Sequence, residues 1–314
     1  MMKKALVTDY VHANLISGLE DRGYKVDYRR DVKLESIGEI IWDYELIVIN
    51  SKIKMYKGLI DKAVNLKYIC RLGSGLEIID LEYCKEKAIH VINTPSGNNN
   101  AVAEHAMGML LSLANNLRKG DAEVRRCEWH REANRGWELM GKTVGIIGFG
   151  HTGSQFAKKL SSWELDVISY DKYRVEYSPE WDFVEKVTLQ DILNRSDIIS
   201  LHLPLTEEVI HLVDDQFISR CKENVIIINT SRGKVINTES LVKALELKHI
   251  GGACLDVFEN EKPPTYSLRE KKLYERLFAQ DSVVLSPHVA GWTNESLVRI
   301  ADVMLAKYDD LQKG

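Results

Sequence analysis

The chain has 314 residues, of which 45% are hydrophobic, and its 42 basic and 46 acidic side chains give a formal net charge of -4. This length exceeds the roughly 250 to 300 residues at which a single hydrophobic core stops growing, so we expect two domains. The charge balance lacks the basic excess that polyanion binding requires, which argues against nucleic acid as a partner.

The sequence also leads us to expect neither secretion nor membrane insertion. The N-terminal apolar stretch is too short for a signal peptide, and no apolar run approaches the roughly 20 residues of a membrane span. The five cysteines (70, 84, 127, 221 and 254) are odd in number and show no CxxC spacing, which favours reduced thiols. We therefore expect a cytoplasmic protein without a membrane partner.

Short apolar runs alternate with helical patterns along the whole chain, which indicates an α/β protein with parallel sheets. Before residue 100 the expected strands are residues 5–8, 25–28, 46–50, 68–72 and 90–93. After residue 140 they are residues 143–147, 166–170, 198–202, 225–229, 252–256 and 282–285. Two groups of strands predict two doubly wound sheets.

A long helix is expected between the two groups, over residues 101–126, where apolar residues recur at helical spacing. The polar segment 127–140 follows and contains Trp129 and Trp137. Because exposed tryptophans in a loop are costly, we expect both to dock on another domain or subunit, with docking inside the same subunit as the alternative. A last helix is expected over residues 294–311.

A glycine-rich run begins the second group of strands. Gly148, Gly150 and Gly153 follow an apolar strand and precede a predicted helix over residues 154–163. In this context the glycines permit a tight turn, a close approach of the backbone to a pyrophosphate, and close packing of helix on strand. Asp171 ends the next strand, where a carboxylate accepts hydrogen bonds from a ribose. The pattern predicts a dinucleotide site, with a structural glycine turn as the alternative.

Polar residues follow three later strands, in the segments 229–233, 256–263 and 286–293. Since open α/β sheets bind ligands at the carboxyl ends of their strands, we expect Arg232, Glu261 and His288 at one sheet edge. An arginine fork binds a carboxylate through two bonds, and a histidine that titrates near neutrality exchanges protons with a carbonyl or hydroxyl group. A neighbouring carboxylate favours the imidazolium and orients the ring. Taken singly, each residue also fits a structural role.

Several motifs together point to a family. They are Ala101-Val102-Ala103-Glu104, the run 141–150, the segment 200–206, Thr230-Ser231-Arg232-Gly233, Asp256-Val257-Phe258 and Pro287-His288. With them the chain resembles, nearly from end to end, the D-isomer-specific 2-hydroxyacid dehydrogenases. The resemblance implies an NAD-dependent oxidoreductase that transfers a hydride between nicotinamide and a D-2-hydroxy acid or 2-keto acid. Phosphoglycerate, glycerate or hydroxypyruvate, glyoxylate and lactate-like acids are the substrates it leaves open.

The resemblance also implies residue roles. Arg232 matches the arginine that binds the substrate carboxylate, Glu261 the acid that holds the histidine, and His288 the acid–base catalyst. Substrate contacts are implied for Ser51, Ser74, Gly75 and Arg232. Contacts with NAD are implied for Asn98, Val102, Gly148, Phe149, Gly150, His151, Thr152, Gly153, Asp171, His202, Pro204, Thr230, Ser231, Arg232, Asp256, His288 and Gly291. No metal site is expected.

The implied architecture is discontinuous. A Rossmann NAD-binding domain, residues 99–289, is inserted into a flavodoxin-like substrate-binding domain made of residues 1–98 and 290–314. We expect a short form without a regulatory domain, and a homodimer that pairs through the long helix and the tryptophan segment. Because the family also contains corepressors that bind dinucleotides, an NAD-sensing interaction protein is the alternative function.

Three features of the sequence bear on the choice of substrate and cofactor. Asn50 stands where phosphoglycerate dehydrogenases often carry an arginine, so phosphorylation of the substrate is left open, with Lys52 or Lys54 as substitute cations. A carboxylate at Asp171 predicts NAD rather than NADP, because the 2′-phosphate of NADP carries a like charge. Lys172 and Arg174 follow immediately and soften this preference if they reach the phosphate.

Overall fold

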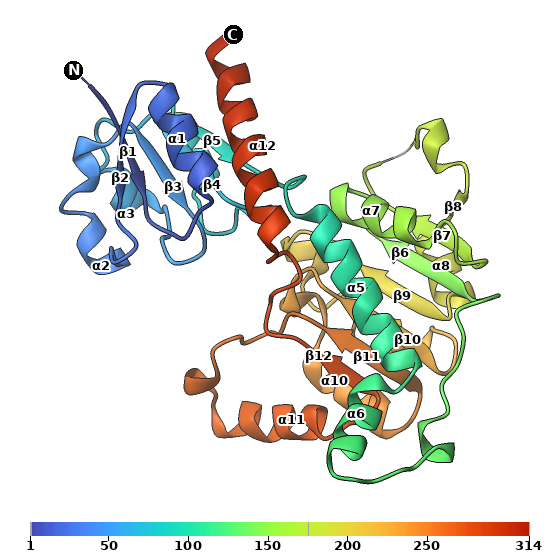
Figure 1. Ribbon diagram of the computed structural model, residues 1–314. Coiled ribbons are helices and arrows are strands. Elements are labelled where there is room, and N and C mark those ends of the chain that lie inside the picture. The colour runs from blue at the N-terminus through green and yellow to red at the C-terminus, as the bar shows by residue number, and fades with distance from the viewer. Residues whose placement is uncertain (1, 175, 314) are drawn as a thin grey trace. The chain divides into compact units, whose positions relative to one another are not determined.

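The structure is a computed structural model that describes residues 2–174 and 176–313, and the chain divides into two compact units. One unit consists of Met1–Asn99 and Trp292–Gly314, and the other of Asn100–Gly291. Each unit contains its own parallel sheet (Figure 1). The two-sheet α/β class predicted from the sequence is therefore confirmed.

The first unit is built on a five-stranded sheet in the order β2-β1-β3-β4-β5. Its strands are β1 (Lys3–Val7), β2 (Tyr24–Tyr28), β3 (Leu46–Ile49), β4 (Tyr68–Arg71) and β5 (His90–Asn93). This order is that of flavodoxin-like folds. Helices cover both faces: α1 (Ala13–Asp21) and α12 (Asn294–Lys313) cover one, and α2 (Leu34–Ile37), α3 (Lys57–Ile60) and α4 (Leu81–Glu86) cover the other.

The second unit is built on a seven-stranded sheet in the order β12-β11-β10-β9-β6-β7-β8. Its strands are β6 (Thr143–Ile147), β7 (Asp166–Tyr170), β8 (Val184–Lys186), β9 (Ile198–Leu201), β10 (Val225–Asn229), β11 (Ile250–Leu255) and β12 (Val283–Leu285). The chain reverses its direction of growth between β6 and β9, and such switch points are where Rossmann folds bind dinucleotides.

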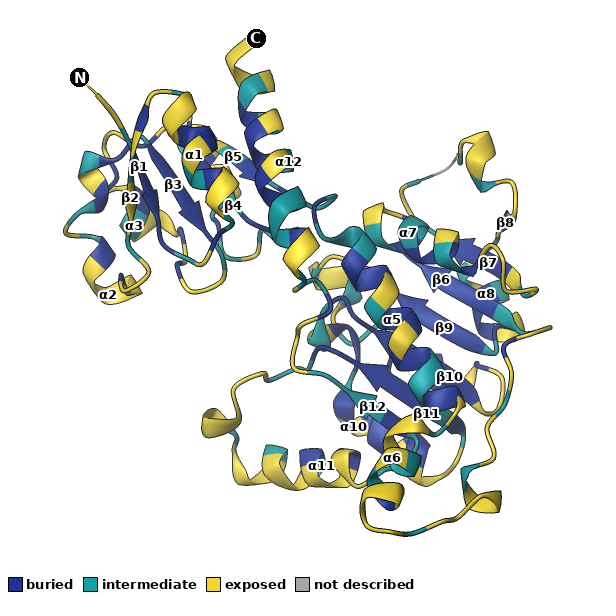
Figure 2. Cartoon of the chain, in the orientation of Figure 1, coloured by how far each residue is buried: buried dark blue, intermediate teal, exposed yellow. Residues whose placement is uncertain are grey.

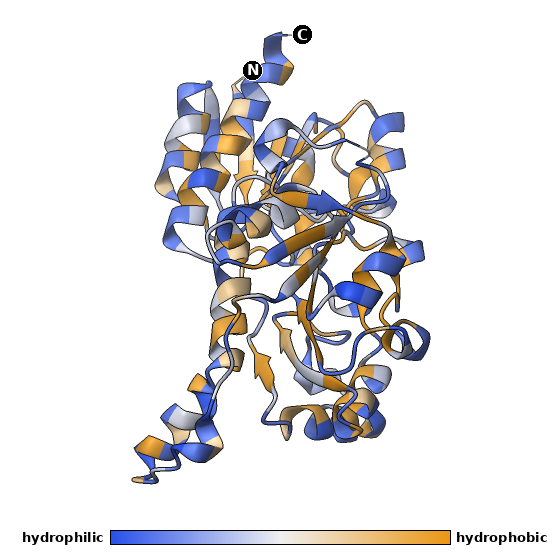
Figure 3. Ribbon diagram, turned by 90° about the vertical axis from the view of Figure 1, so that its right-hand side faces the viewer, coloured by the Kyte–Doolittle hydropathy of each residue, from blue (hydrophilic) through white to orange (hydrophobic). Residues whose placement is uncertain are grey.

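Helices pack on both faces of this second sheet. The helices α5 (Asn99–Ala114) and α7 (His151–Leu160) contribute to one core. The helices α8 (Leu189–Arg195), α9 (Asp215–Ser219), α10 (Thr238–Glu246) and α11 (Leu268–Phe278) contribute to the other. The inner strands β6, β9, β10 and β11 are almost fully buried, whereas the helices carry one buried and one polar face, as Figures 2 and 3 show. Burial on both faces explains the continuous apolar runs of these inner strands.

The predicted single helix over residues 101–126 is wrong. Two helices, α5 and α6 (Leu117–Arg125), are separated by Asn115 and Asn116, and Asn116 has a left-handed backbone with φ of 50°. Asparagine tolerates this conformation better than most residues. The Asn116 side chain donates to the carbonyl of Arg135 at 3.2 Å, which stabilises the break.

The two tryptophans after α6 differ in their surroundings. Trp137 is partly buried and packs against the core to which α5 and α7 contribute. This residue therefore docks within its own subunit, as the alternative prediction states. Trp129 is 75% exposed. Within the described residues, no helix combines the length and the apolar character that a membrane crossing needs.

Candidate active site

His288 and Glu261 form a hydrogen-bonded pair at the carboxyl edge of the second sheet. Glu261 follows β11 and His288 follows β12, and Nδ1 of His288 lies 2.8 Å from Oε2 of Glu261. Burial by itself would raise the pKa of Glu261, but the hydrogen bond and charge of His288, with smaller contributions from Phe258 N–H and Arg232, lower it. Glu261 is therefore a carboxylate at neutral pH.

Arg232 lies in the turn that follows β10, the strand next to β11. Its charge contributes to the lowered pKa of Glu261, so the structure brings Arg232 and the Glu261 carboxylate into one electrostatic environment. The buried Asn229 holds this turn, because its amide donates to the Arg232 carbonyl at 2.9 Å and accepts from Ser231 N–H at 3.0 Å. Sequence reasoning missed Asn229, whose signal is a polar residue at the end of an apolar strand.

The loop that carries His288 is held by Asp256, whose carboxylate is buried. It accepts hydrogen bonds from Ser286 Oγ at 2.6 Å and from the N–H groups of Val289 and Ala290 at 2.9 Å. His288 itself donates its N–H to the Asp256 carbonyl at 2.7 Å and has a left-handed φ of 56°. These bonds hold His288 in a backbone conformation that costs energy for a residue other than glycine.

A histidine from α5 extends this network. Nε2 of His105 lies 2.8 Å from Ser286 Oγ and 3.7 Å from Oδ1 of Asp256. Neither His105 nor Ser286 was among the predicted site residues, because their separation of 181 positions leaves no local signal.

The loop that carries Glu261 is clamped on two sides. Glu259 accepts the N–H of Thr238, the first residue of α10, at 2.8 Å and lies 2.7 Å from Nε2 of His211. Asn260 donates its N–H to the hydroxyl of Tyr274 at 3.0 Å, on α11. Neither of these two sets of contacts was predicted from the sequence. They leave little freedom to the backbone just before Glu261.

The glycine-rich loop between β6 and α7 has the geometry that a pyrophosphate requires. Gly148 has φ of 91°, and a Cβ on Gly153 would lie 2.0 Å from the Gly148 carbonyl oxygen. A Cβ on Gly150 would meet no atom within 4 Å, so this part of the loop faces open space at the N-terminus of α7. The backbone N–H groups and helix dipole there favour an anionic group.

Asp171 stands at the end of β7, as predicted, and its carboxylate is already anchored. Oδ2 accepts from Phe149 N–H at 2.7 Å, and Oδ1 accepts from Tyr173 N–H and Arg174 N–H at 2.9 Å. Burial would raise the pKa of Asp171, but these three backbone bonds, with the charge of Arg174, lower it. Oδ2 accepts one bond and keeps a lone pair for a ribose hydroxyl, whereas Oδ1 already accepts two bonds. The loop and this carboxylate therefore fit a dinucleotide.

The remaining predicted residues fall into three groups. The side chains of Phe149 and Val102 are buried, and the Phe149 N–H and carbonyl already bond to Asp171 and Arg174. Burial lowers the pKa of His202 to about 3, and the ring is neutral at neutral pH. Exposed or partly exposed residues at the edge of the second unit are His151, Thr152, Pro204 and Gly291, whereas Thr230 and Ser231 are mostly buried in the Arg232 turn.

Four predicted ligand residues belong to the first unit: Ser51, Ser74, Gly75 and Asn98. Ser51 follows β3, and Ser74 and Gly75 follow β4, so these three lie at the carboxyl edge of the first sheet. The Ser74 carbonyl accepts a hydrogen bond from the Asn93 amide at 3.0 Å. Polar residues thus occupy the ligand-binding edge of each sheet.

Known proteins are similar to this chain in sequence. The family model described as "D-isomer specific 2-hydroxyacid dehydrogenase, NAD binding domain" matches residues 107–290. The hydroxypyruvate reductase of Thermotoga maritima is 38% identical over 274 residues, which cover 87% of this chain and 86% of that protein. The D-3-phosphoglycerate dehydrogenase of Methanocaldococcus jannaschii is 36% identical over the whole chain, which spans 58% of its length.

A solved structure agrees in fold over nearly the whole chain. The D-lactate dehydrogenase of Aquifex aeolicus, complexed with NAD and lactic acid, is 29% identical, with a TM-score of 0.84 over 99% of this chain and 96% of that chain. By sequence and by fold, the chain belongs to the D-isomer specific 2-hydroxyacid dehydrogenases, a family of NAD-dependent oxidoreductases.

Proposed function

We propose that this enzyme interconverts a small D-2-hydroxy acid and its 2-keto acid. The observation that carries the proposal is the hydrogen-bonded His288–Glu261 pair with Arg232 in the turn after the adjacent strand, at the carboxyl edge of the second sheet. A proton donor and a carboxylate-binding cation are the two side-chain functions that such a substrate requires. The cofactor NAD fits the glycine loop and Asp171, and when bound it supplies or accepts the hydride.

The side chains have separate tasks in the direction of reduction. Arg232 binds the carboxylate of the keto acid and orients its carbonyl carbon toward the nicotinamide. The imidazolium of His288 donates its Nε2 proton to the carbonyl oxygen as the hydride reaches the carbon, so that an alkoxide never accumulates. Glu261 holds the ring through Nδ1 and stabilises the imidazolium. In the reverse direction neutral His288 accepts the hydroxyl proton.

The substrate is a 2-keto acid of few carbons, such as hydroxypyruvate, glyoxylate, pyruvate or a phosphorylated hydroxypyruvate. Its reduction is supported by relatives named for hydroxypyruvate, phosphoglycerate and lactate. We propose that the second unit binds NAD and that the first unit, through Ser51, Ser74 and Gly75, contributes to substrate binding. For a phosphorylated substrate, the candidate cations are Lys52 and Lys54, which follow Ser51 in the sequence. The Nζ of Lys52 donates to the Arg30 carbonyl at 2.8 Å.

Steady-state oxidation of NADH across a panel of 2-keto acids tests this function. We expect turnover with at least one short acid, and the ratio of kcat/KM for hydroxypyruvate and its phosphate reports on the phosphate. His288→Asn serves as the inactive control. The absence of turnover with every acid, while NADH still binds, would contradict the proposal.

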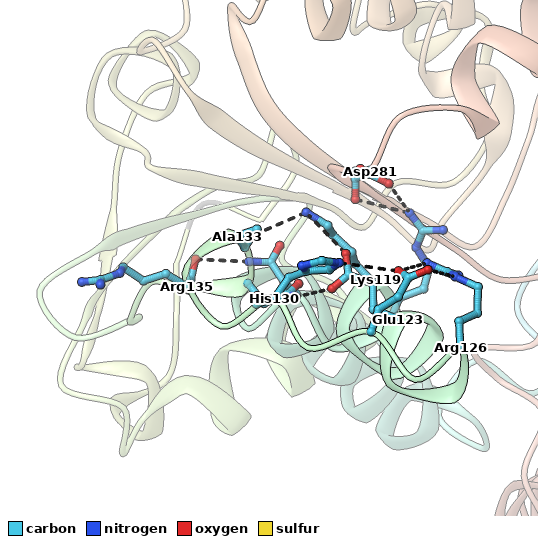
Figure 4. A network of polar contacts seen from close by, with 11 residues as sticks. Lys119, Glu123, Arg126, His130, Ala133, Arg135 and Asp281 are labelled. Carbon is cyan, nitrogen blue, oxygen red and sulfur yellow. Dashed lines mark hydrogen bonds and ion pairs between the residues drawn. The ribbon is translucent and has the colours of Figure 1, made fainter.

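We also propose a homodimer that pairs through α6 and the segment after it. Leu117, Val124 and Trp129 are 57%, 52% and 75% exposed there. A polar network orders the segment: Glu123 is buried and accepts from the Asn134 amide, and Lys119 donates to the Ala133 carbonyl at 3.4 Å (Figure 4). An ordered segment that exposes large apolar side chains is typical of an interface.

The mass in solution tests the dimer. Light scattering at micromolar concentration should give about twice the chain mass of 35.8 kDa, and Trp129→Ser should shift the mass toward that of one chain. A wild-type protein with the mass of one chain would contradict the dimer. We further propose a cytoplasmic location, which the five free cysteines support.

A further inference from the structure

Glu208 holds two residues that directly follow Asp171. It lies in the 3₁₀ turn Glu207–Val209 after β9, and its carboxylate pairs with Lys172 Nζ and accepts a hydrogen bond from the hydroxyl of Tyr173. The Lys172 ammonium also lies over the Tyr173 ring, 5.4 Å from its centroid. Glu208 has a lowered pKa through its bonds to Lys172 and Tyr173. The one lysine beside Asp171 is thus neutralised by an acid from a different loop.

The other cation beside Asp171 is also engaged by protein groups. Nη1 of Arg174 donates to the Phe149 carbonyl at 2.8 Å, and its guanidinium lies 5.5 and 5.4 Å from the ring centroids of Phe149 and Tyr177. Arg174 N–H also bonds to Asp171. Lys172 and Arg174, the two cations that the sequence offers for a 2′-phosphate, therefore already have partners. The carboxylates of Asp171 and Glu208 both bond to this segment.

We propose that Glu208 is a second determinant of cofactor choice, which disfavours NADP by keeping Lys172 paired. This inference rests on the proposed binding of NAD by the glycine loop and Asp171. A 2′-phosphate carries a charge of roughly -1.5 to -2, and to use Lys172 it must displace Glu208 and then face that released carboxylate. The ribose hydroxyls of NAD do not require the displacement of Glu208. Glu208 therefore acts on NADP and leaves NAD almost unaffected.

Direct binding separates this role from effects on turnover. NADH and NADPH are titrated by their own fluorescence against wild type, Glu208→Gln and Glu207→Gln. Glu207 is the matched control, because it is the preceding residue of the same turn, is exposed, and has no ion pair among the described residues. Glu208→Gln should tighten NADPH binding by about 3- to 5-fold and change NADH binding by less than about twofold. Glu207→Gln should change the ratio of the two affinities by less than about twofold.

A double variant tests the route through Lys172. In Lys172→Met/Glu208→Gln the gain in NADPH affinity should disappear, because the lysine that the substitution releases is absent. An unchanged NADPH to NADH ratio in Glu208→Gln, an equal change in Glu207→Gln, or a gain that survives in the double variant would each overturn the inference. Those results leave the proposed function intact as long as wild type binds NADH, whereas a wild type that binds neither cofactor overturns both.

Discussion

The carbonyl of Phe258 occupies the space that a side chain on Gly233 would need: a Cβ at Gly233 would lie 1.9 Å from the Phe258 oxygen. Gly233 follows Arg232, and Phe258 begins the loop that carries Glu261. The carboxylate-binding turn and the acid-bearing loop therefore pack backbone against backbone. This contact explains how residues 29 positions apart, Arg232 and Glu261, share one electrostatic environment.

Gly233→Ala should separate these two segments. The added methyl group meets backbone atoms that have no rotamer to escape into, so we expect a loss of about 1 to 3 kcal/mol in the free energy of unfolding. We also expect kcat/KM for the keto acid to fall more than NADH affinity, because the glycine loop lies elsewhere in the unit. Denaturant unfolding and NADH titration measure the two effects. An alanine variant with wild-type kcat/KM would show that the close contact has no role in catalysis.

His288 and Glu261 should behave as one proton-transfer unit. His288→Asn removes the proton donor and should lower kcat by about 10²-fold or more. Glu261→Gln keeps the shape but removes the anion that stabilises the imidazolium, so the alkaline limb of the reduction profile should move to lower pH. The pH dependence of kcat/KM for keto acid reduction measures this shift.

The acid limb depends on Glu261 itself. Because its pKa is lowered in the folded protein, the anionic partner of His288 is fully present above the ordinary pKa of a glutamate and is lost only as the pH falls through the lowered pKa. Wild-type reduction should therefore persist to pH values below the ordinary glutamate pKa before the Glu261 carboxylate is lost. Identical pH profiles for wild type and Glu261→Gln, at full activity, would refute the assigned roles.

Arg232→Lys should damage recognition of the acid and spare the cofactor. Lysine keeps the charge but loses the planar fork that binds both carboxylate oxygens. We expect kcat/KM for the keto acid to fall by at least about 10-fold. The dissociation constant of NADH should stay within about twofold of wild type. If NADH binding weakens as much as substrate turnover, Arg232 serves the cofactor or the fold instead.

The strands show which parts of this fold are readable from sequence. The strands β5, β6, β7 and β10 have the predicted bounds. For β6, β7 and β10 the reason is that buried parallel strands are largely apolar runs that polar or glycine residues follow. The strand β8 was not predicted, since Val184 is its one buried residue. The break between α5 and α6 was also missed, because apolar spacing continues past Asn116 while the backbone does not.

The residues of the candidate site also divide into those that the sequence predicts and those that it does not. Arg232, Glu261 and His288 were predicted because each follows a strand and matches a family motif. Asn229, Glu259, His105 and Ser286 were not, since their partners are backbone groups or side chains distant in sequence. Which bonds a polar side chain makes with loops is determined by the folded backbone and has no periodic pattern.

Glu259→Ala should loosen the Glu261 loop without touching substrate or cofactor. It removes the bonds to Thr238 N–H and His211, and it leaves the clamp at Asn260 in place. We expect kcat to fall by about 10-fold with little change in NADH affinity. Glu259→Gln, which keeps an acceptor for Thr238 N–H, should recover part of kcat and serves as the conservative control. Equal losses in both variants would indicate that the charge, and not the clamp, matters.

Asp256→Asn should disturb His288 through its backbone. An amide has one oxygen where the carboxylate has two, so its NH₂ group would face Ser286 Oγ and Val289 N–H or else Ala290 N–H. A buried donor facing another donor costs about 1 to 3 kcal/mol, and the loop can escape this cost by relaxing the left-handed φ of His288. We therefore expect a lower free energy of unfolding together with a kcat loss of at least about 10-fold.

Ser286→Ala is the matched control: it removes one donor to Asp256 but keeps both backbone bonds, and it should retain most of kcat. A stable Asp256→Asn variant with wild-type kcat would show that these backbone bonds do not position His288.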